Sequence, residues 1–557
     1  MSDAFNPNEF IQVAVKTVEQ HFSGELCFHL PWFQRAYAWN EDHADRLLHD
    51  ILEASQSTRG RYFLGHVMLA RPNGEAQAAI IDGHQRSLTL TILFALIRDR
   101  APDEEIAHRM HRLLIKPGND GERARFRITP QPTNSDFFST YVQRPGATLT
   151  EAGSGLPESE QKFLDNRDRL AKTLDENLQS QDAWSRLATF LLSRCFLLVE
   201  VVQDEDEAWE MLSIEETTGL DFHSSDRSKV ALISVMEHDV QDEAGQKWDI
   251  WRARLGADGM MLLLGHIRSL RSERRSSKPV EQSLIELYGL NRGGLAFIDT
   301  VLVPQAENYH ALRNNRVGAG VATPKIAQAL DYLNWLEREA WVPAALSWLE
   351  HKSSDDPETP RFFTLLDRLA WVLRIAGRDP VEQERRFMRI VSAVRDARPL
   401  GQIVEFNIED RILSGAIENL LSRTFYDKGY SRLVLRRLSK LQGGKGRQID
   451  GDKATVEHIL PRRPARGSKW FRAFPNKNDI NQNVHRLGNL AILSFDDNQK
   501  AGSKDFVEKK PILAGSDFTM SQQIASLPNW TPDVITERSI EMARALLASW
   551  NLEFSFN

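Results

Sequence analysis

The stretch TVEHILP, residues 455–461, places two residues that can do chemistry side by side. Glu457 and His458 stand there between β-branched residues, and Pro461 follows shortly after. A neutral imidazole can take a proton from an attacking water, and a carboxylate beside it can bind a divalent cation. The plain alternative is a strand end with two polar side chains. Glu457 and His458 are therefore a candidate metal ligand and a candidate general base.

A second segment, HRLGNLAILSFDDNQK (485–500), offers two asparagines that could serve the same site. Asn489 follows a glycine in a tight turn, where its amide can hydrogen-bond backbone and hold the loop rigid. Asn498 opens the following helix and could direct its oxygen to the same cation. Oxygen ligands suit Mg²⁺ or Mn²⁺, so these two ions are the expected cofactors.

The residues around TVEHILP are strongly basic although the chain as a whole is acidic. The net charge is −7, yet residues 427–472 hold 13 Lys and Arg against 4 Asp and Glu. Such a segment is most often a solvated helix face, but here it runs directly into the candidate site. A basic surface beside a cutting site would follow a phosphate backbone.

Two N-terminal segments, LPWFQRAYAW (30–39) and IIDGHQRSLTL (80–90), raise the same question at the other end of the chain. Arg35 and Arg86 each follow a glutamine, and arginine forks suit phosphates. A DGHQR turn that opens a helix would also present backbone N–H groups to an anion, with Asp82 near enough to hold Mg²⁺. No GxxxxGK[ST] motif is present, so this is not a P-loop.

Each of these N-terminal segments also has a simpler interpretation. The DGHQR turn could be a structural Asp-Gly turn flanked by surface salt bridges. The four aromatics of WFQRAYAW are more often a core wedge than a platform on which nucleic acid bases stack.

Composition sets the limits within which these motifs must act. A chain of 557 residues suggests three or four domains, and 41% hydrophobic with 26% charged residues is ordinary for a globular protein. Only Cys27 and Cys195 are present, which excludes a disulfide framework and a four-cysteine zinc site. No apolar run or N-terminal signal pattern indicates a membrane or export, so we expect no membrane partner and a cytoplasmic location.

The elements that must position the motifs follow from periodicity. DHADRLLHDILEAS and LTLTILFALIRDR predict helices, and RYFLGHVMLA and AQAAIIDG predict strands on either side of a turn. Residues 145–160 predict a surface loop, and most segments from about 160 to 440 have helical periodicity. LQGGKGRQIDGDK (441–453) predicts a linker, and SIEMARALLASW predicts a closing amphipathic helix.

The C-terminal motifs resemble the HNH, or ββα-metal, nuclease family, and in particular the C-terminal nuclease of GmrSD-like, modification-dependent (type IV) restriction enzymes. The matching residues are Glu457-His458-Ile459-x-Pro461, Leu487-Gly488-Asn489-Leu490, Asn498-x-Lys500, Lys504, Phe506, Lys509, Trp530 and Arg538. The resemblance implies His458 as general base, Asn489 as the loop organiser of the catalytic group, and Glu457 and Asn498 as metal ligands. The expected DNA-binding residues are Arg462, Arg463, Arg466, Lys469, His485, Lys500 and Lys504, with His485 as readily a packing residue.

The N-terminal motifs resemble the N-terminal domain of the same restriction family, which is related to the ParB/sulfiredoxin-like nucleotide-binding fold. The family pattern DGQQR appears here as DGHQR, and GLDFHSSDRSKV (219–230) resembles a later family element. Just upstream of that element, Glu216 and Thr218 stand where the family usually has Asn and Arg, which makes the pocket less positive. The resemblance implies nucleotide binding by Gln34, Arg35, Asp82, Gly83, His84, Gln85, Arg86, Asp226 and Lys229.

Together these interpretations predict an α+β multidomain protein. We expect a ParB/sulfiredoxin-like nucleotide-binding domain over residues 1–150, a mostly helical body over 151–420 and an HNH nuclease over 421–557. The helical body includes an element at 210–230 that completes the N-terminal domain. The resemblance implies an anti-phage DNA endonuclease that nicks or cuts foreign, modified DNA, regulated by binding or hydrolysis of a nucleoside triphosphate. GTP, ATP, CTP and UTP are not distinguished, and a homodimer stays open. Two alternatives remain: a nucleotide-dependent DNA sensor with a degenerate nuclease, and an indiscriminate nuclease toxin triggered by infection.

Overall fold

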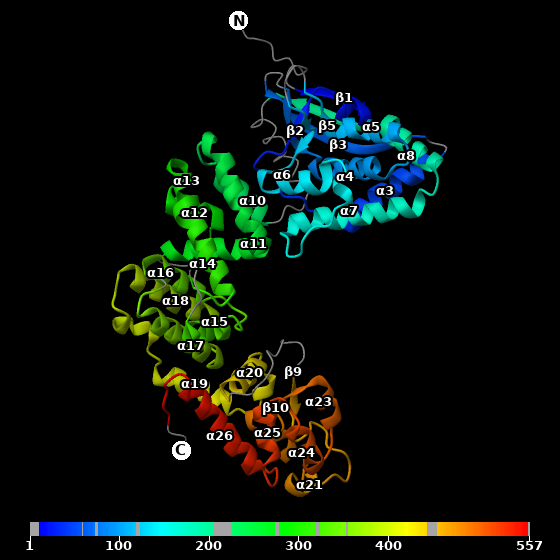
Figure 1. The fold of residues 1–557 in the computed structure, drawn as a ribbon. Coiled ribbons are helices and arrows are strands. Elements are labelled where there is room, and N and C mark those ends of the chain that lie inside the picture. Colours follow the sequence, from blue (N-terminus) through cyan, green and yellow to red (C-terminus); the bar gives the residue numbers. More distant parts are fainter. Residues whose placement is uncertain are drawn as a thin grey trace. The chain divides into compact units, whose positions relative to one another are not determined.

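The computed structural model describes residues 11–57, 60–72, 76–118, 123–203, 224–272, 278–317, 323–352, 355–442 and 454–554. Its contacts divide the chain into two compact units (Figure 1). The first unit comprises residues 1–268 and 276–306, and the second comprises residues 269–275 and 307–557. The linker expected at 441–453 lies almost wholly outside the described residues, as do residues 219–223 of the segment 219–230.

A six-stranded mixed sheet forms the centre of the first unit. Its order is β1-β8-β3-β4-β2-β7, with β1 and β8 antiparallel, β8 and β3 parallel, and β3 and β4 antiparallel. The strands are β1 (Ile11–Thr17), β2 (Cys27–His29), β3 (Tyr62–Ala70), β4 (Gln77–Asp82), β7 (Ile128–Thr129) and β8 (Cys195–Val202). Because β8 lies between β1 and β3, the α/β layer continues beyond residue 150 and includes a strand within the range expected to be helical.

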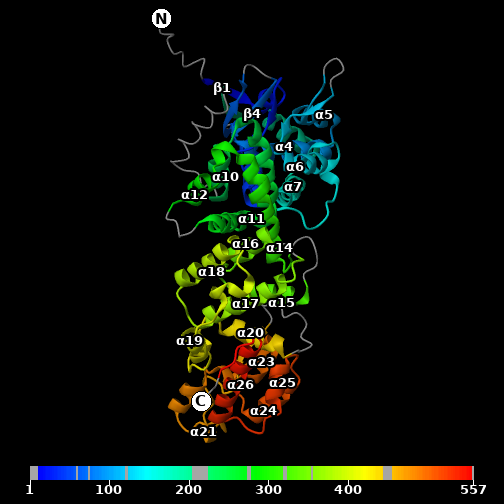
Figure 2. The ribbon, with the colours of Figure 1, turned by 90° about the vertical axis from the view of Figure 1, so that its left-hand side faces the viewer.

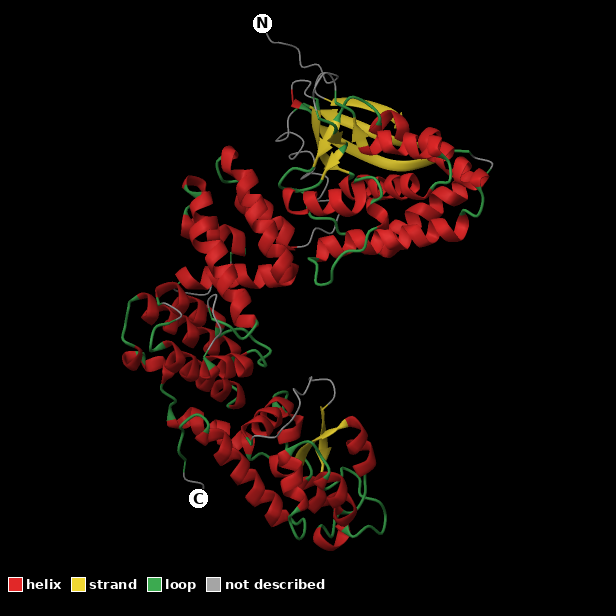
Figure 3. Ribbon diagram, viewed as in Figure 1, coloured by secondary structure: helices red, strands yellow, loops and turns green. Residues whose placement is uncertain are grey.

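Helices cover one face of this sheet, as Figures 1 and 3 show. The turned view in Figure 2 shows the same layering of α4 and α7 beneath the strands. The helices of this part are α2 (Val18–Phe22), α3 (Glu41–Gln56), α4 (His84–Arg100), α5 (Glu104–Leu114), α6 (Pro132–Phe138), α7 (Glu158–Asn177) and α8 (Gln181–Ser193). A short two-stranded sheet, β5 (Ile115–Lys116) with β6 (Arg125–Phe126), follows α5.

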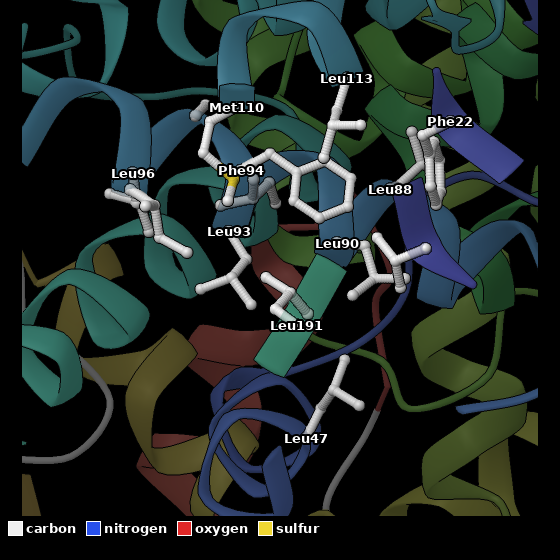
Figure 4. Packing of buried hydrophobic residues seen from close by; sticks show 14 of the residues in the cluster. Phe22, Leu47, Leu88, Leu90, Leu93, Phe94, Leu96, Met110, Leu113 and Leu191 are labelled. Carbon is white, nitrogen blue, oxygen red and sulfur yellow. The ribbon is translucent and has the colours of Figure 1, made fainter. Parts of the chain in front are cut away.

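The central helix α4 is apolar on every side and is buried accordingly. Leu88, Leu90 and Phe94 of α4 pack with Phe22 and Leu191, as Figure 4 shows. The strands and helices expected between residues 41 and 100 are thus confirmed as α3, β3, β4 and α4.

The second face of the sheet is only partly covered. At one end Met68, Ile81 and Val202 pack with Val230 of α10 (Ser224–Ile233). At the other end Val15 and Phe63 stay 66% and 53% exposed. The remaining helices of this unit are α10, α11 (His238–Arg271, interrupted at Gly256), α12 (Val280–Tyr288) and α13 (Gly294–Phe297), and α14 (Val303–Arg313) begins here.

The second unit begins with a helical body. It contains α15 (Pro324–Leu333), α16 (Val342–His351), α17 (Thr359–Ile375), α18 (Pro380–Arg395), α19 (Asp410–Leu420) and α20 (Ser431–Leu441). Arg437 of α20 is buried and forms a bidentate ion pair with Asp367 of α17, at 2.7 and 2.6 Å. Its guanidinium also lies 3.9 Å from the ring centre of Tyr332 and 4.8 Å from that of Trp550. One charged side chain therefore joins three helices to the C-terminal segment.

The last part of the chain is built on two paired strands and a helix that packs against them. β9 (Ala454–His458) pairs antiparallel with β10 (Leu490–Ser494), and α23 (Phe495–Ala501) comes directly after β10. The surrounding helices are α21 (Trp470–Ala473), α22 (Lys477–Asn483), α24 (Phe506–Ala514), α25 (Thr519–Ala525) and α26 (Pro532–Ala548). The closing amphipathic helix expected from SIEMARALLASW is confirmed as the second half of α26. None of the helices in the described part of the chain has the length and apolar content that a membrane span requires.

Candidate functional site

His458 is the last residue of β9, and the pairing of β9 with β10 places it opposite Leu490. The hairpin continues past this pair, because the Ile459 N–H donates to the carbonyl of Asn489 at 3.0 Å. The imidazole is 8% exposed, so it lies just below the surface rather than deep in the core.

Two aromatic residues surround the His458 ring. Its Nε2 lies 3.3 Å from Nδ1 of His485. The ring of Tyr426 stands edge-on to His458 at 4.5 Å and stacks on His485 at 5.3 Å with 17° between the planes. The backbone of Tyr426 also donates to the His485 carbonyl at 3.0 Å. His485, expected to contact DNA or to pack, therefore packs against the candidate base.

Burial, helped by the nearby charges of His485, Arg462 and Lys509, lowers the pKa of His458 to about 3. The imidazole is consequently unprotonated throughout the physiological range, which is the state a proton acceptor needs. A phosphate that approached would favour the charged form and raise this pKa. The site can thus hold a neutral base that becomes stronger when an anionic substrate is present.

Asn489 makes the loop-organising contacts expected of it. The side chain is completely buried and uses all of its hydrogen-bonding capacity. Its Oδ1 accepts from the Leu460 N–H at 2.8 Å and from Trp530 Nε1 at 3.0 Å. Its Nδ2 donates to the carbonyls of Leu460 and Val484 at 3.0 and 2.8 Å. Asn489 therefore fixes the turn after His458 and cannot touch a substrate.

The glycine before Asn489 lets the turn meet helix α26. A Cβ at Gly488 would lie 1.9 Å from the carbonyl oxygen of Ile535, so only glycine fits. The Gly488 N–H donates to Ser539 Oγ at 2.9 Å, and Arg538 donates to the carbonyls of Gly488 and Leu490. The GNL motif is thus a docking point for α26.

The expectation that Glu457 is a metal ligand beside His458 is not supported by the structure. Successive residues of a strand point to opposite faces, so Glu457 turns away from His458. Its Oε1 forms an ion pair with Nζ of Lys509 in α24, and the two side chains are 4% and 0% exposed. Lys509 Nζ also donates to the His458 carbonyl at 2.9 Å. Burial raises the pKa of Glu457 and lowers that of Lys509, and each partner's charge opposes this effect.

Asn498, the second expected metal ligand, is anchored to β9. Its Nδ2 donates to Thr455 Oγ1 at 2.7 Å and to the Val456 carbonyl at 3.2 Å. The described residues contain no group of three or more His, Cys, Asp or Glu side chains that could hold a metal ion. Of the two expected ligands, only Asn498 keeps an oxygen that fits a cation, since the charge of Glu457 is already neutralised by Lys509.

The remaining basic residues expected to contact DNA lie on the surface. Arg462, Arg463, Arg466, Lys469, Lys500 and Lys504 are all exposed. Lys500 pairs with Asp497 at 3.1 Å, which leaves its charge partly compensated. The exposed arginines after Pro461 follow the candidate base directly in the chain, so their position fits contact with a polyanion.

At the N-terminal end, the structure brings the two predicted segments together. Gln34 Nε2 donates to the Ile81 carbonyl, and Gln85 Oε1 accepts from the N–H groups of Ala38 and Trp39. Gln85 Nε2 also lies 2.7 Å from Nε2 of His84. These three polar side chains are at most 6% exposed. Gln34, Gln85 and His84 therefore join the WFQRAYAW loop to the DGHQR turn, and their role as nucleotide ligands stays a prediction.

His84 is neutral in this environment. Burial, together with the charge of Arg35, lowers its pKa to about 3. Gly83 is in the left-handed region, at φ 85°, and a Cβ there would lie 2.9 Å from the His66 carbonyl oxygen. The turn is thus shaped by close packing between β4, β3 and the start of α4.

Asp82 and Arg86 meet two residues that the sequence motifs did not single out. His66 of β3 lies 3.7 Å from Asp82 through Nδ1 and 3.0 Å from Glu200 of β8 through Nε2. Arg86 packs over Gly65, where a Cβ would lie 2.7 Å from its Nη1. His66, Asp82, Glu200 and Arg86 form the sheet-face cluster. Strand alternation in RYFLGHVMLA could have placed His66 on a sheet face, but only the pairing of β3 with β8 shows that Glu200 lies beside it.

The charges of the sheet-face cluster stabilise one another. The contact with Asp82 raises the pKa of His66 despite its burial, and Glu200 raises it further. Burial disfavours the Asp82 carboxylate, but contacts with His66 and the Gly83 N–H outweigh it and lower the pKa of Asp82. Protonated His66 therefore lies between the carboxylates of Asp82 and Glu200, close to the point where β4 ends and α4 begins.

The later element of the expected nucleotide site is tied up in ion pairs. Lys229 is 2% exposed and donates to both oxygens of Asp249 at 2.7 and 2.8 Å. Asp226 accepts from Arg252 at 3.1 Å. Lys229 is thus held in a buried ion pair, and its role as a nucleotide ligand stays a prediction. Asp226 and Arg35 line a cavity of about 400 Å³ together with Arg252 and Arg254, so these two expected residues do come together.

Comparison with known protein families identifies both ends of the chain. Residues 16–233 match the model described as "GmrSD restriction endonuclease, N-terminal domain". Residues 414–545 match the model described as "GmrSD restriction endonucleases, C-terminal domain". No curated protein matches the chain. The first match spans β1 to α10 and contains the sheet-face cluster, and the second spans α19 to α26 and contains His458, His485 and Asn489.

The N-terminal model matches ahead of the C-terminal model, and together the two matches cover more than half of the chain. They bear out the resemblance that the motifs at both ends indicated. The chain therefore belongs to the GmrSD family of type IV restriction endonucleases, enzymes of defence whose substrate is DNA.

Proposed function

We propose that this restriction endonuclease cleaves foreign, modified DNA with His458 as the general base, and that a nucleoside triphosphate bound by the N-terminal domain regulates the cleavage. The observation that carries the first half is the setting of His458: an imidazole buried at the end of β9 and held by Tyr426 and His485, followed in the chain by exposed arginines. A neutral imidazole can take the proton of the water that attacks a phosphodiester.

The neighbours of His458 have separate tasks in this scheme. Tyr426 and His485 hold the ring at a fixed angle, and Asn489 fixes the turn that follows it. Arg462 and the arginines after it would hold the phosphate backbone and balance the negative charge that grows in the transition state. The succession of β9, β10 and α23 supports interpretation of this part as a ββα, or HNH, nuclease.

Dependence on Mg²⁺ or Mn²⁺ is a further part of the proposal. A divalent cation would supply charge stabilisation at the scissile phosphate, and Asn498 is the expected ligand whose oxygen fits it. The carboxylate of Glu457 is not part of this proposed metal site, because its charge is neutralised by Lys509.

Nucleotide binding is supported by two groups of residues in the first unit. The sheet-face cluster presents Arg86 at the start of α4, and the neighbouring cavity presents Arg35 with Arg252 and Arg254. Guanidinium groups beside a helix N-terminus suit phosphates. The mixed sheet with its buried α4 supports interpretation of this part as a ParB/sulfiredoxin-like fold.

A nicking assay tests the proposal. The full chain is incubated with phage DNA that carries modified bases and with plain plasmid, each with Mg²⁺ or Mn²⁺ and with or without each nucleoside triphosphate. We expect cleavage of the modified DNA that changes with the nucleotide and stops with EDTA. Absence of cleavage on every DNA would favour a sensor with a degenerate nuclease, and equal cleavage of both DNAs would favour an indiscriminate toxin.

A further inference from the structure

The helical body between the two family matches contains a groove to which the matches assign no role. Helix α18, the 3₁₀ turn Val404–Phe406 and the start of α19 enclose a space of about 660 Å³. Nine of its lining residues are charged, namely Arg378, Asp379, Glu382, Arg385, Arg386, Arg389, Glu405, Glu409 and Arg411. If every charged side chain of the groove formed an ion pair with another, the groove would have no charge left to bind a ligand. The ion pairs among these residues therefore decide whether it can bind one.

Most carboxylates of the groove are already engaged. Glu382 forms a bidentate pair with Arg378, at 2.7 Å from each oxygen to Nη2. Glu409 accepts from Arg386 at 2.9 Å, and Arg386 also donates to the backbone carbonyls of Glu405 and Asn407. Asp379 caps the N-terminus of α18 by accepting from the N–H groups of Val381 and Glu382.

Three guanidinium groups remain. Arg385, Arg389 and Arg411 are exposed, and none has a hydrogen bond or an ion pair to any residue that the structure describes. Glu405 is the one carboxylate in the groove whose Oε2 finds no donor within the described ranges. Five arginines therefore face four carboxylates in the groove, and the groove keeps a small positive excess that lies with the three exposed arginines.

The spacing of these arginines suits a chain of phosphates. Arg385 and Arg389 lie four residues apart in α18, which puts them on one face of the helix, about 6 Å apart at their Cβ atoms. Arg411 approaches from the first turn of α19. Arginine rather than lysine at all three positions favours planar, two-pronged contact with phosphate oxygens.

Two further features of the groove fit a nucleic acid backbone. The N-cap residue of α19, Glu409, gives its helix no side-chain cap. The Ile412 N–H donates to the Glu409 carbonyl, whereas the first-turn N–H groups of Asp410 and Arg411 have no acceptor among the described residues. Val381 and Val404 on the walls are 38% and 63% exposed, although both are apolar. Such side chains can contact deoxyribose while the guanidinium groups contact the phosphates on either side of it.

We propose that this groove, the α18–α19 groove, is a second DNA-backbone site through which the helical body binds substrate without reading its sequence. The inference rests on DNA as the substrate and adds a contact surface outside the nuclease and nucleotide domains. Each phosphate contact that is lost should reduce the slope of log affinity against log salt by about 0.9, so three contacts amount to roughly 2.7.

The test uses the full chain with His458→Ala, so that DNA is bound but not cut. Arg385→Gln, Arg389→Gln and Arg411→Gln are combined in one variant. The matched control combines Arg316→Gln, Arg338→Gln and Arg361→Gln, three exposed arginines of the same helical body that lie outside the groove. Binding of a fluorescent duplex is titrated over a range of salt concentrations, and free nucleoside triphosphate binding is measured on the same proteins.

We expect the groove variant to bind duplex more weakly than the control and with a salt slope smaller by two to three. Thermal unfolding should be the same in both, since all six side chains are exposed. Equal slopes in the two variants would overturn the proposal. Loss of nucleotide binding with an unchanged DNA slope would also overturn it and would assign the groove to free nucleotide phosphates. Cleavage by the chain with His458 intact is measured separately, so failure of this inference is distinct from failure of the proposed function.

Discussion

Lys509 and Glu457 form an ion pair inside the core of the C-terminal domain, where the lysine side chain is fully buried and the glutamate is 4% exposed. The same ammonium holds the carbonyl of His458 at 2.9 Å. The pair therefore fixes the backbone at the residue proposed as the base. It also occupies the carboxylate that the EH motif would assign to a metal.

Replacing one member of this pair should destabilise the domain strongly. Lys509→Met leaves a buried carboxylate without its partner, which typically costs about 3–5 kcal/mol. Chemical denaturation of the full chain, followed by fluorescence of Trp470 and Trp530 in the same core, measures the loss. The double variant Glu457→Gln/Lys509→Met should recover much of it, because neither charge is then left alone. A Glu457→Gln protein with unchanged stability and lost metal binding would instead restore Glu457 as a ligand.

Removal of the His458 imidazole should abolish cleavage and leave binding intact. His458→Ala takes away the proton acceptor, and general-base catalysis typically contributes 10²–10⁴-fold in rate. The single-turnover rate of nicking and the duplex affinity are measured on the same preparation. His485→Gln is the companion variant, and it should slow cleavage less, since His485 orients the ring of His458. Full activity of His458→Ala would end the assignment of this residue as the base.

Asn489→Ala should lower stability without any direct effect on substrate binding. The change leaves the Leu460 N–H and the Trp530 Nε1–H buried without an acceptor, at about 1–3 kcal/mol for each group. Urea unfolding measures the difference from the wild type. Asn481→Ala, at an exposed position of α22, is the control and should change the free energy of unfolding by less than about 0.5 kcal/mol. A stable Asn489→Ala protein with no cleavage would point to a chemical role instead.

Acid should destabilise the fold through three buried histidines. Burial lowers the pKa values of His21, His84 and His458 to about 3, whereas an unfolded histidine titrates near 6.5. Between these values the unfolded chain binds more protons, so stability is fully present above pH 6.5 and falls as the pH drops toward 3. Thermal unfolding at a series of pH values measures this fall. His21→Leu, which removes one of the three groups from an aromatic contact, should make the fall less steep.

His66 should act in the opposite direction. Its pKa is raised by Asp82 and Glu200, so the contribution of its cation is present below the unfolded value of about 6.5 and is lost as the pH rises through the raised value. Thermal unfolding of His66→Gln should therefore differ more from the wild type at pH 6 than at pH 9. An equal difference at both values would show that the charge of His66 does not stabilise the sheet-face cluster.

Much of the local structure follows from the order of residues alone. DHADRLLHDILEAS predicts a helix because its apolar side chains recur on one face, which must be buried. LTLTILFALIRDR predicts a helix because it is a long, mostly apolar run, and such a helix is buried on all sides. The motifs EHILP, GNL and DGHQR point to the family because they combine glycine turns with polar residues at strand ends. The family matches confirm that identification at both ends of the chain.

The roles of individual polar residues were decided only by the tertiary structure. A sequence shows that Glu457, Gln85 and Lys229 are polar, but it does not show which distant group each one meets. Lys509 lies 52 positions from Glu457, and Asp249 lies 20 positions from Lys229. A buried charge must find a partner, and that partner comes from whichever element packs against it. The chain's own order thus determined where turns and helices form, whereas long-range packing determined which polar side chains hold the fold together and which remain able to meet a substrate.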